Sequence, residues 1–156
     1  MADFIQWCQN SALSQMIRAE PWPYPAIETL HLAGLILVFG SVLVVNLRIF
    51  GRVLRHSPTN EIARGAAPVT MFGLAAQFIS GPLLFITSAM RFSENPSFWV
   101  KLCLLAVALA YHFFVHRPLT FREDVAAAML RRSAAVSMAL WMGVVLAGMG
   151  IELLST

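Results

Sequence analysis

Residues 24–51 form an apolar run that is long enough to cross a lipid bilayer and yet carries Glu28, His31 and Asn46. A membrane-spanning helix needs about 20 predominantly apolar residues, each rising about 1.5 Å along the helix axis. Ionisable groups inside such a helix are costly, so they usually face the interior of a helix bundle and mark function. The polar side chains of this run are therefore the first candidates for a functional site.

The composition of the whole chain is that of an integral membrane protein. Hydrophobic residues make up 58% of the 156 residues, charged residues make up 12%, and the mean hydropathy is +0.71. In a soluble domain about 25% of the residues are charged. The excess of basic over acidic residues, 11 against 8, falls between apolar runs and reports membrane topology rather than a nucleic-acid partner. Cys8 and Cys103 stand far apart, so no disulfide framework is expected.

The apolar runs predict four spans, at about residues 26–48, 66–89, 98–116 and 133–154. Residues 3–18 predict one amphipathic helix in the membrane interface, and the early Asp3 argues against a cleaved signal peptide. Short connections predict an all-α fold, an up-down-up-down four-helix bundle that forms a single transmembrane domain over residues 1–156. Arginines gather after the first and third spans, so we expect those connections in the cytoplasm and both termini in the periplasm.

Each predicted span carries polar residues along one helical face, because positions 3, 4, 7, 11 or 18 apart share a face. These residues are Glu28, His31 and Asn46 in the first span, Thr70, Gln77, Ser80 and Ser88 in the second, Lys101, His112 and His116 in the third, and Ser137, Trp141 and Glu152 in the fourth. The four faces predict a shared polar interior. The alternative is that Ser, Thr and Gln simply hold helices together by hydrogen bonds.

His31 is the leading candidate ligand, because a neutral imidazole binds iron or copper. Gly34, one turn further on, would let a flat macrocycle or another helix approach closely, so a helix-packing role is the alternative. Glu28 and His31 also have the E-x-x-H spacing of di-iron bundles, but the chain supplies a single such motif. Glu28 with Glu152 could instead serve a proton path, or pair with Lys101.

His112 and His116 form a second candidate pair, since their spacing of four places both imidazoles on one helix face. His56 stands at about the same level and could join them; alternatively, His116 and Arg117 form a basic cluster at the end of a span. His31 and His112 differ in depth by roughly 18 Å at 1.5 Å per residue, so we do not expect one iron to be held by both.

A haem at His31 would therefore need another second ligand near the depth of His31. The candidates are Met149 or Met90, a residue from another subunit, or no second ligand at all.

Several short motifs resemble those of an uncharacterised family of small bacterial inner-membrane proteins with four spans. They are E-x-x-H-x-x-G at residues 28–34, N-L-R-x-x-G at residues 46–51, with Asn46 where Asp is expected, N-P-x-F-x-x-K at residues 95–101, and His116-Arg117. More distantly, F-W-V-K-L at residues 98–102 is similar to the membrane domain of copper resistance protein D and of b-type cytochromes. The first resemblance covers about residues 20–155. It implies the fold and the bacterial inner membrane, but no activity.

The leading functional hypothesis is a membrane-embedded protein that binds haem b or another redox metal and transfers electrons. The expected cofactor-binding residues are His31, His112, His116, Glu28 and Gly34, and the expected metal ligands are His31 and Met149. One alternative is a non-enzymatic oligomeric or accessory subunit of a membrane complex. Another is the transport of copper or a small solute, using His31, Met142 and Met149. The sequence has no nucleophile–base arrangement, phosphate-binding glycine loop or nucleic-acid motif, so the expected partners are the lipid bilayer and other subunits.

Overall fold

The computed structural model of the chain describes residues 2–153, without the side chains of Ala2 and Glu152, and every regular element in this range is helical. In chain order the elements are α1 (Ala2–Gln9), α2 (Ala12–Ala19), α3 (Pro23–Ile49), α4 (Thr59–Thr87), α5 (Ala89–Glu94), α6 (Pro96–Tyr111), the π-helical turn η1 (His112–His116), α7 (Arg117–Phe121) and α8 (Ala127–Leu153). Four helices are long and apolar enough to cross a membrane: α3, α4, the continuous helix Pro96–Phe121, and α8. The expected all-α four-helix membrane bundle is confirmed.

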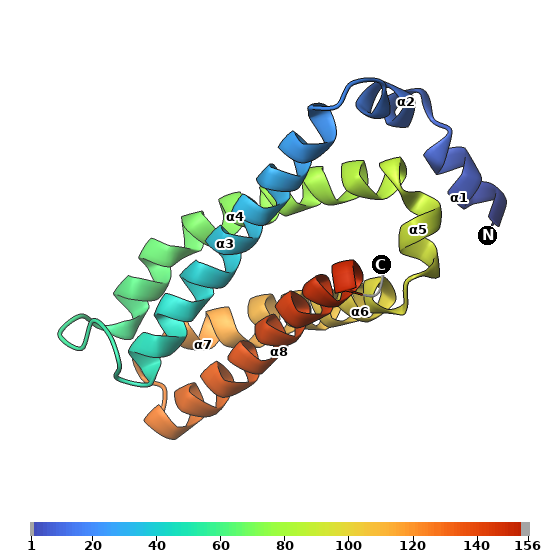
Figure 1. The fold of residues 1–156 in the computed structure, drawn as a ribbon. Helices are drawn as coiled ribbons and strands as arrows, with labels where there is room; N and C mark the ends of the chain where they lie inside the picture. The colour runs from blue at the N-terminus through green and yellow to red at the C-terminus, as the bar shows by residue number, and fades with distance from the viewer. Residues whose placement is uncertain (1, 154–156) are drawn as a thin grey trace.

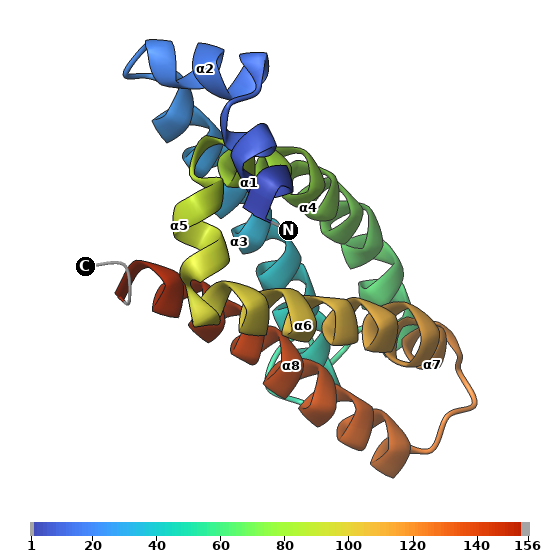
Figure 2. The ribbon, with the colours of Figure 1, turned by 90° about the vertical axis from the view of Figure 1, so that its right-hand side faces the viewer.

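The four long helices are arranged as two antiparallel hairpins (Figure 1). One hairpin is formed by α3 and α4, and the other by α6–η1–α7 and α8; α3 also packs against α8, and α4 against α7. At the end of the bundle that contains α7 the hairpins lie close together, and they diverge toward the opposite end. There α5 crosses from one hairpin to the other (Figure 2). We call these two ends the α7 end and the α5 end.

A close backbone contact joins α3 to α4 where Gly34 meets Gly73. A Cβ atom at Gly34 would lie 2.9 Å from the carbonyl oxygen of Gly73, and a Cβ atom at Gly73 would lie 2.8 Å from the carbonyl oxygen of Gly34. Small residues at such crossings let membrane helices approach closely, and van der Waals packing then stabilises the pair because lipid supplies no hydrophobic driving force. The glycine pair therefore fixes where the two helices cross.

Two clusters of buried apolar side chains complete the core. The first comprises Val38, Val42, Leu74, Ala108, Trp141 and Val144. The second lies nearer the α7 end and comprises Val45, Ile49, Ala63 and Ala134. Many large apolar side chains outside these clusters are exposed, as on a surface that faces lipid. The core is consequently narrow, and small polar residues share it with the aliphatic ones.

The N-terminal segment consists of α1 and α2, so the single helix expected over residues 3–18 is a wrong prediction. The reason is Ser11, whose hydroxyl accepts a hydrogen bond from the Ser14 backbone N–H at 3.3 Å and caps a new helix. Ser14 in turn donates to the Ile86 carbonyl at 3.0 Å, and Gln9 accepts from the Met90 backbone N–H at 2.9 Å. The two short helices are thereby attached to the α5 end of the bundle (Figure 2).

Most of the long helices extend beyond the apolar runs. The second begins at Thr59 instead of 66, the third ends at Phe121 instead of 116, and the fourth begins at Ala127 instead of 133. In the third helix Arg117 lies 5.9 Å from the Phe113 ring centroid and 5.1 Å from that of Phe121, so its charge is accommodated within the helix. Hydropathy detects the apolar part of a span, whereas backbone hydrogen bonding continues past the hydrocarbon.

Candidate functional site

The polar faces of the four spans meet in the interior of the bundle, as the helical spacing predicts. The buried polar residues on these faces are Asn46, Thr70, Ser80, His112, His116 and Ser137, and Trp141 is buried beside them. They do not form one continuous site. His31, Gln77, Ser80 and Lys101 form a cluster toward the α5 end, which we call the His31 cluster, and the two other span histidines adjoin a cavity toward the α7 end.

Hydrogen bonds in the His31 cluster assign a tautomer to the His31 ring. The Ser80 hydroxyl donates to the Ala76 carbonyl at 2.6 Å, so its oxygen is left to accept from His31 Nδ1–H at 2.9 Å. With the proton on Nδ1, Nε2 carries a lone pair, and Lys101 Nζ lies 3.5 Å from it. A histidine held in this way presents one nitrogen as a ligand or a base, which is how metal-binding histidines are commonly oriented.

Two glycines adjoin the side chains of the His31 cluster. A Cβ atom at Gly81 would lie 3.6 Å from His31 Cε1, and one at Gly148 would lie 3.6 Å from Lys101 Nζ. Gln77 also donates to the His31 carbonyl at 2.8 Å. The two facing nitrogens come from different hairpins, since His31 belongs to α3 and Lys101 to α6, so this contact bridges the hairpins where they diverge.

Glu28 and Gly34 have other surroundings than the sequence suggested. Glu28 is half-buried and forms no ion pair with any residue in the range 2–153, so Lys101 contacts His31 and not Glu28. The neighbour that approaches Gly34 is α4, through Gly73, Ala76 and Gln77. Gly34 therefore serves the close packing of α3 against α4, which is the alternative to the approach of a macrocycle. The side chain of Glu152 lies outside the described part of the structure.

His112 and His116 lie together in the π-helical turn η1, with ring centroids 6.0 Å apart. His116 Nδ1 is 3.0 Å from the Ser133 hydroxyl, and the His112 ring stands edge-on to Trp141 at 6.3 Å. Within residues 2–153, His112 Nδ1 and His116 Nε2 are buried without a hydrogen-bond partner. Single π-helical turns often occur at functional sites, and each buried, unpaired nitrogen is a candidate for binding a water or an ion.

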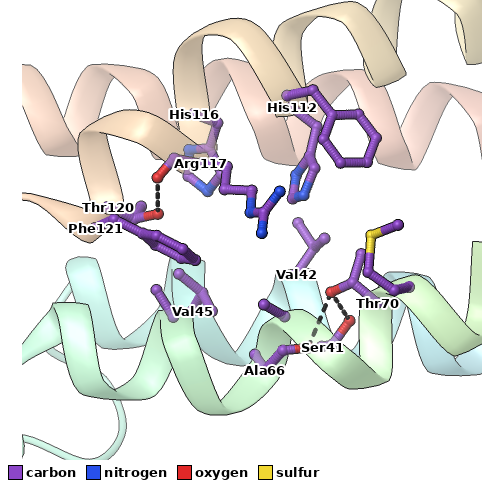
Figure 3. A pocket seen from close by; sticks show the side chains of 14 residues that line it. Ser41, Val42, Val45, Ala66, Thr70, His112, His116, Arg117, Thr120 and Phe121 are labelled. Carbon is purple, nitrogen blue, oxygen red and sulfur yellow. Dashed lines mark hydrogen bonds between the residues drawn. The ribbon is translucent and has the colours of Figure 1, made fainter.

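The cavity beside these histidines has a volume of about 20 Å³ and is lined by Ser41, Thr70, Arg117 and Phe121 among others (Figure 3). Such a volume holds about one water molecule, whereas pockets for organic ligands span about 300–1,000 Å³. The Arg117 side chain also reaches between the two histidines in Figure 3. The space therefore accommodates a water or a single ion and excludes a haem in this packing.

The remaining candidate residues lie apart from both groups. His56 is exposed in the connection between α3 and α4 and does not line the cavity, so it does not join His112 and His116. Met149 is 58% exposed and Met90 is 43% exposed, and the hydrogen bonds of the His31 ring go to Ser80 and Lys101 instead. The separation of His31 from His112 agrees with their expected difference in depth. His116 is buried, so it does not belong to an interfacial basic cluster.

Lys101 is the member of the His31 cluster that sequence reasoning did not connect to His31. A signal was available, because α3 and α6 begin at the same end of the bundle. His31 stands eight residues after the start of α3 and Lys101 five after the start of α6, which gives the two similar depths. Counting from helix starts would have paired them. The direction in which each side chain points around its helix could be known only from the packed structure.

The fold and its polar interior define a multi-pass, all-helical membrane protein with two internal polar sites. Residues 4–153 match the model of a family of unknown function, DUF6644, and the chain belongs to that family. Neither the curated proteins nor the solved structures contain a significant match.

Proposed function

We propose that the protein holds a redox-active metal centre, haem b in the first instance, at His31 and acts in electron transfer. The observation that carries the proposal is the pair of facing nitrogens, His31 Nε2 and Lys101 Nζ, at 3.5 Å. Both lie within membrane-spanning helices, where ionisable residues are rare and usually functional. No carboxylate pairs with Lys101 among the described side chains, so a structural ion pair does not account for it.

The donor set fits a transition-metal ion. Nitrogen ligands bind such ions at about 2.0–2.1 Å, so two nitrogens on one metal are at most about 4 Å apart. His31 Nε2 and Lys101 Nζ already satisfy that limit, provided that the lysine binds as a neutral amine. The Ser80 hydroxyl would keep Nδ1 protonated and the ring oriented. Bound haem would supply one-electron chemistry, and His31 and Lys101 are the residues that would hold it.

The same geometry weakens the copper-passage alternative. Met142 and Met149 are 41% and 58% exposed, so these thioethers lie on the surface of α8 and not along a polar interior. His112 and His116 retain a role only as a site for one ion or water, beside the fixed positive charge of Arg117. Copper at His31 and Lys101 remains a variant of the proposed centre.

We further propose the bacterial inner membrane as the location, with the α7 end in the cytoplasm. The connections at that end carry most of the arginines, and cytoplasmic loops are enriched in basic residues. Both termini would then be periplasmic. The His31 cluster would lie in the periplasmic half of the membrane, within reach of a redox partner on that side.

The absorption spectrum of the protein, purified after expression with ample haem, tests the proposal. We expect a Soret band that shifts on reduction by dithionite. His31→Ala should lose most of this band, whereas Lys101→Leu should keep haem but change the spectrum, because the side chain at position 101 would no longer supply a nitrogen ligand. His56→Ala is the matched control, since His56 is exposed and belongs neither to the His31 cluster nor to the lining of the cavity. A colourless protein that also lacks copper and iron by elemental analysis would rule the proposal out.

A second candidate function is that of an oligomeric or accessory subunit, and the exposure of the third span favours it. Only 11% of the most apolar window of Pro96–Phe121 is buried, against 22% to 33% in the other three spans. A second copy or a larger partner could cover this helix. Native mass spectrometry from mild detergent should then give a dimer or higher species that Phe114→Ala weakens, Phe114 being 82% exposed. A monomer at all concentrations contradicts this candidate.

A further inference from the structure

An open groove lies between the end of α3 and the first half of α8, on the α7 end of the bundle. Its lining residues are Leu47, Phe50, Arg52, Arg131 and Met138, and its volume is about 530 Å³. The residues that line it combine an apolar floor with two arginines. We call it the α3–α8 groove, and we propose that it binds an anionic phospholipid, with the phosphate on the arginines and an acyl chain on the apolar floor.

The arginines of the groove differ from most of those near the same end because their guanidinium groups have no partner in the described part of the chain. Other arginines there are engaged: Arg48 donates to the Ser57 carbonyl, Arg55 to the Gly51 carbonyl, Arg64 and Arg117 lie over aromatic rings, and Arg122 pairs with Asp124. Arg52 and Arg131 are exposed and remain available. A guanidinium group without a partner at a membrane boundary is suited to a phosphate, which it can bind in a bidentate manner.

The carboxylates of this end are directed elsewhere. Glu123 accepts from Asn60 at 2.9 Å, Asp124 accepts from Arg122 at 3.1 Å, Glu61 is exposed in the first turn of α4, and none of these three carboxylates lines the groove. The groove therefore has a net positive charge with no internal counterion. An anion is the complementary ligand.

The apolar floor decides which kind of anion fits. All three apolar side chains are half-buried: Leu47 and Met138 belong to the membrane-spanning helices α3 and α8, and Phe50 directly follows α3, so the apolar side of the groove continues toward the hydrocarbon region. A soluble phosphate would leave this floor covered only by water. A phospholipid binds to both parts of the groove, with its phosphate on the arginines and its acyl chain on the apolar side chains. Basic pockets between helices on the cytoplasmic side are typical sites for anionic headgroups.

Native mass spectrometry of the delipidated full-length protein, given equal amounts of phosphatidylglycerol and phosphatidylcholine, tests the proposal. We expect selective retention of phosphatidylglycerol, and a drop of about 25-fold in its affinity in Arg52→Gln/Arg131→Gln, taking about fivefold for each arginine. Arg52→Lys/Arg131→Lys should retain part of the binding, because the charge remains. Circular dichroism of each variant verifies that it is folded.

The matched control is Arg55→Gln/Arg132→Gln, which removes two exposed arginines of the same end that do not line the groove. It should leave the retention of phosphatidylglycerol unchanged. An equal loss in both double variants would mean general attraction to a basic surface and would overturn the proposal. So would equal retention of phosphatidylcholine, or displacement of the lipid by soluble glycerol phosphate at comparable concentration.

Discussion

An alanine in place of Gly73 is expected to push α3 and α4 apart and to lower the free energy of unfolding by about 2 kcal/mol. Its Cβ atom would lie 2.8 Å from the Gly34 carbonyl oxygen, 2.8 Å from Val38 Cγ2 and 2.9 Å from Leu37 Cβ. The first of these is backbone, and the others are held by the helix, so no flexible end can move away. The overlap outweighs the gain of about 1 kcal/mol that alanine usually brings to a helix interior.

Unfolding in mixed micelles, followed by circular dichroism, measures this effect. Gly40→Ala and Gly65→Ala are the matched controls in the same two helices, because nothing lies within 4 Å of a Cβ atom at either position. Both should be neutral or slightly stabilising. Gly34→Ala combined with Gly73→Ala should cost less than the sum of the single changes, since both Cβ atoms enter the same crossing. If the free energy of unfolding of Gly73→Ala equals that of Gly40→Ala, the close crossing of α3 and α4 is contradicted.

The four spans were predictable because burial in lipid imposes a length and an apolar composition on each helix. Their ends were not, because a helix continues into the headgroup region wherever capping and side-chain packing allow it. Ser11 caps a new helix inside the segment predicted as one helix. Arg117 lies over two aromatic rings, and the third helix continues past this charged residue. Such local contacts leave little trace in hydropathy.

The inward faces of the spans were also predictable, because helical periodicity relates residues within one helix. Ser137 and Trp141 are both buried, as their spacing of four predicts. Met142 follows Trp141 by one position, about 100° further around the helix, and is exposed; Met149, seven positions on, shares its side. Contacts between helices were harder, since His31 and Lys101 meet only once the rotation of α3 and α6 is known.

Replacing Trp141 by alanine is expected to lower the free energy of unfolding by about 3 kcal/mol, the largest effect of any single truncation in the core. Trp141 is 2% exposed and packs in the cluster that joins α3, α4, α6 and α8. Its removal leaves a cavity that lipid chains do not reach. The decrease in the free energy of unfolding stays at the lower end of the usual range. The reason is that burial from lipid brings little hydrophobic gain, so mainly van der Waals packing is lost. Unfolding in mixed micelles again provides the measurement.

Trp22→Ala is the control for that change, since Trp22 is 68% exposed at the start of α3 and should cost less than about 0.5 kcal/mol. Trp141 packs against His112, a member of the second polar site. Its replacement therefore tests which of the two polar sites holds the cofactor. If the cofactor lies at His31, Trp141→Ala should lower stability while the spectrum of the folded protein stays unchanged. A spectrum that changes in Trp141→Ala but not in His31→Ala would contradict a cofactor at His31 and would place it at His112 and His116. The cavity beside these two histidines would then have to become much larger than the volume of one water molecule.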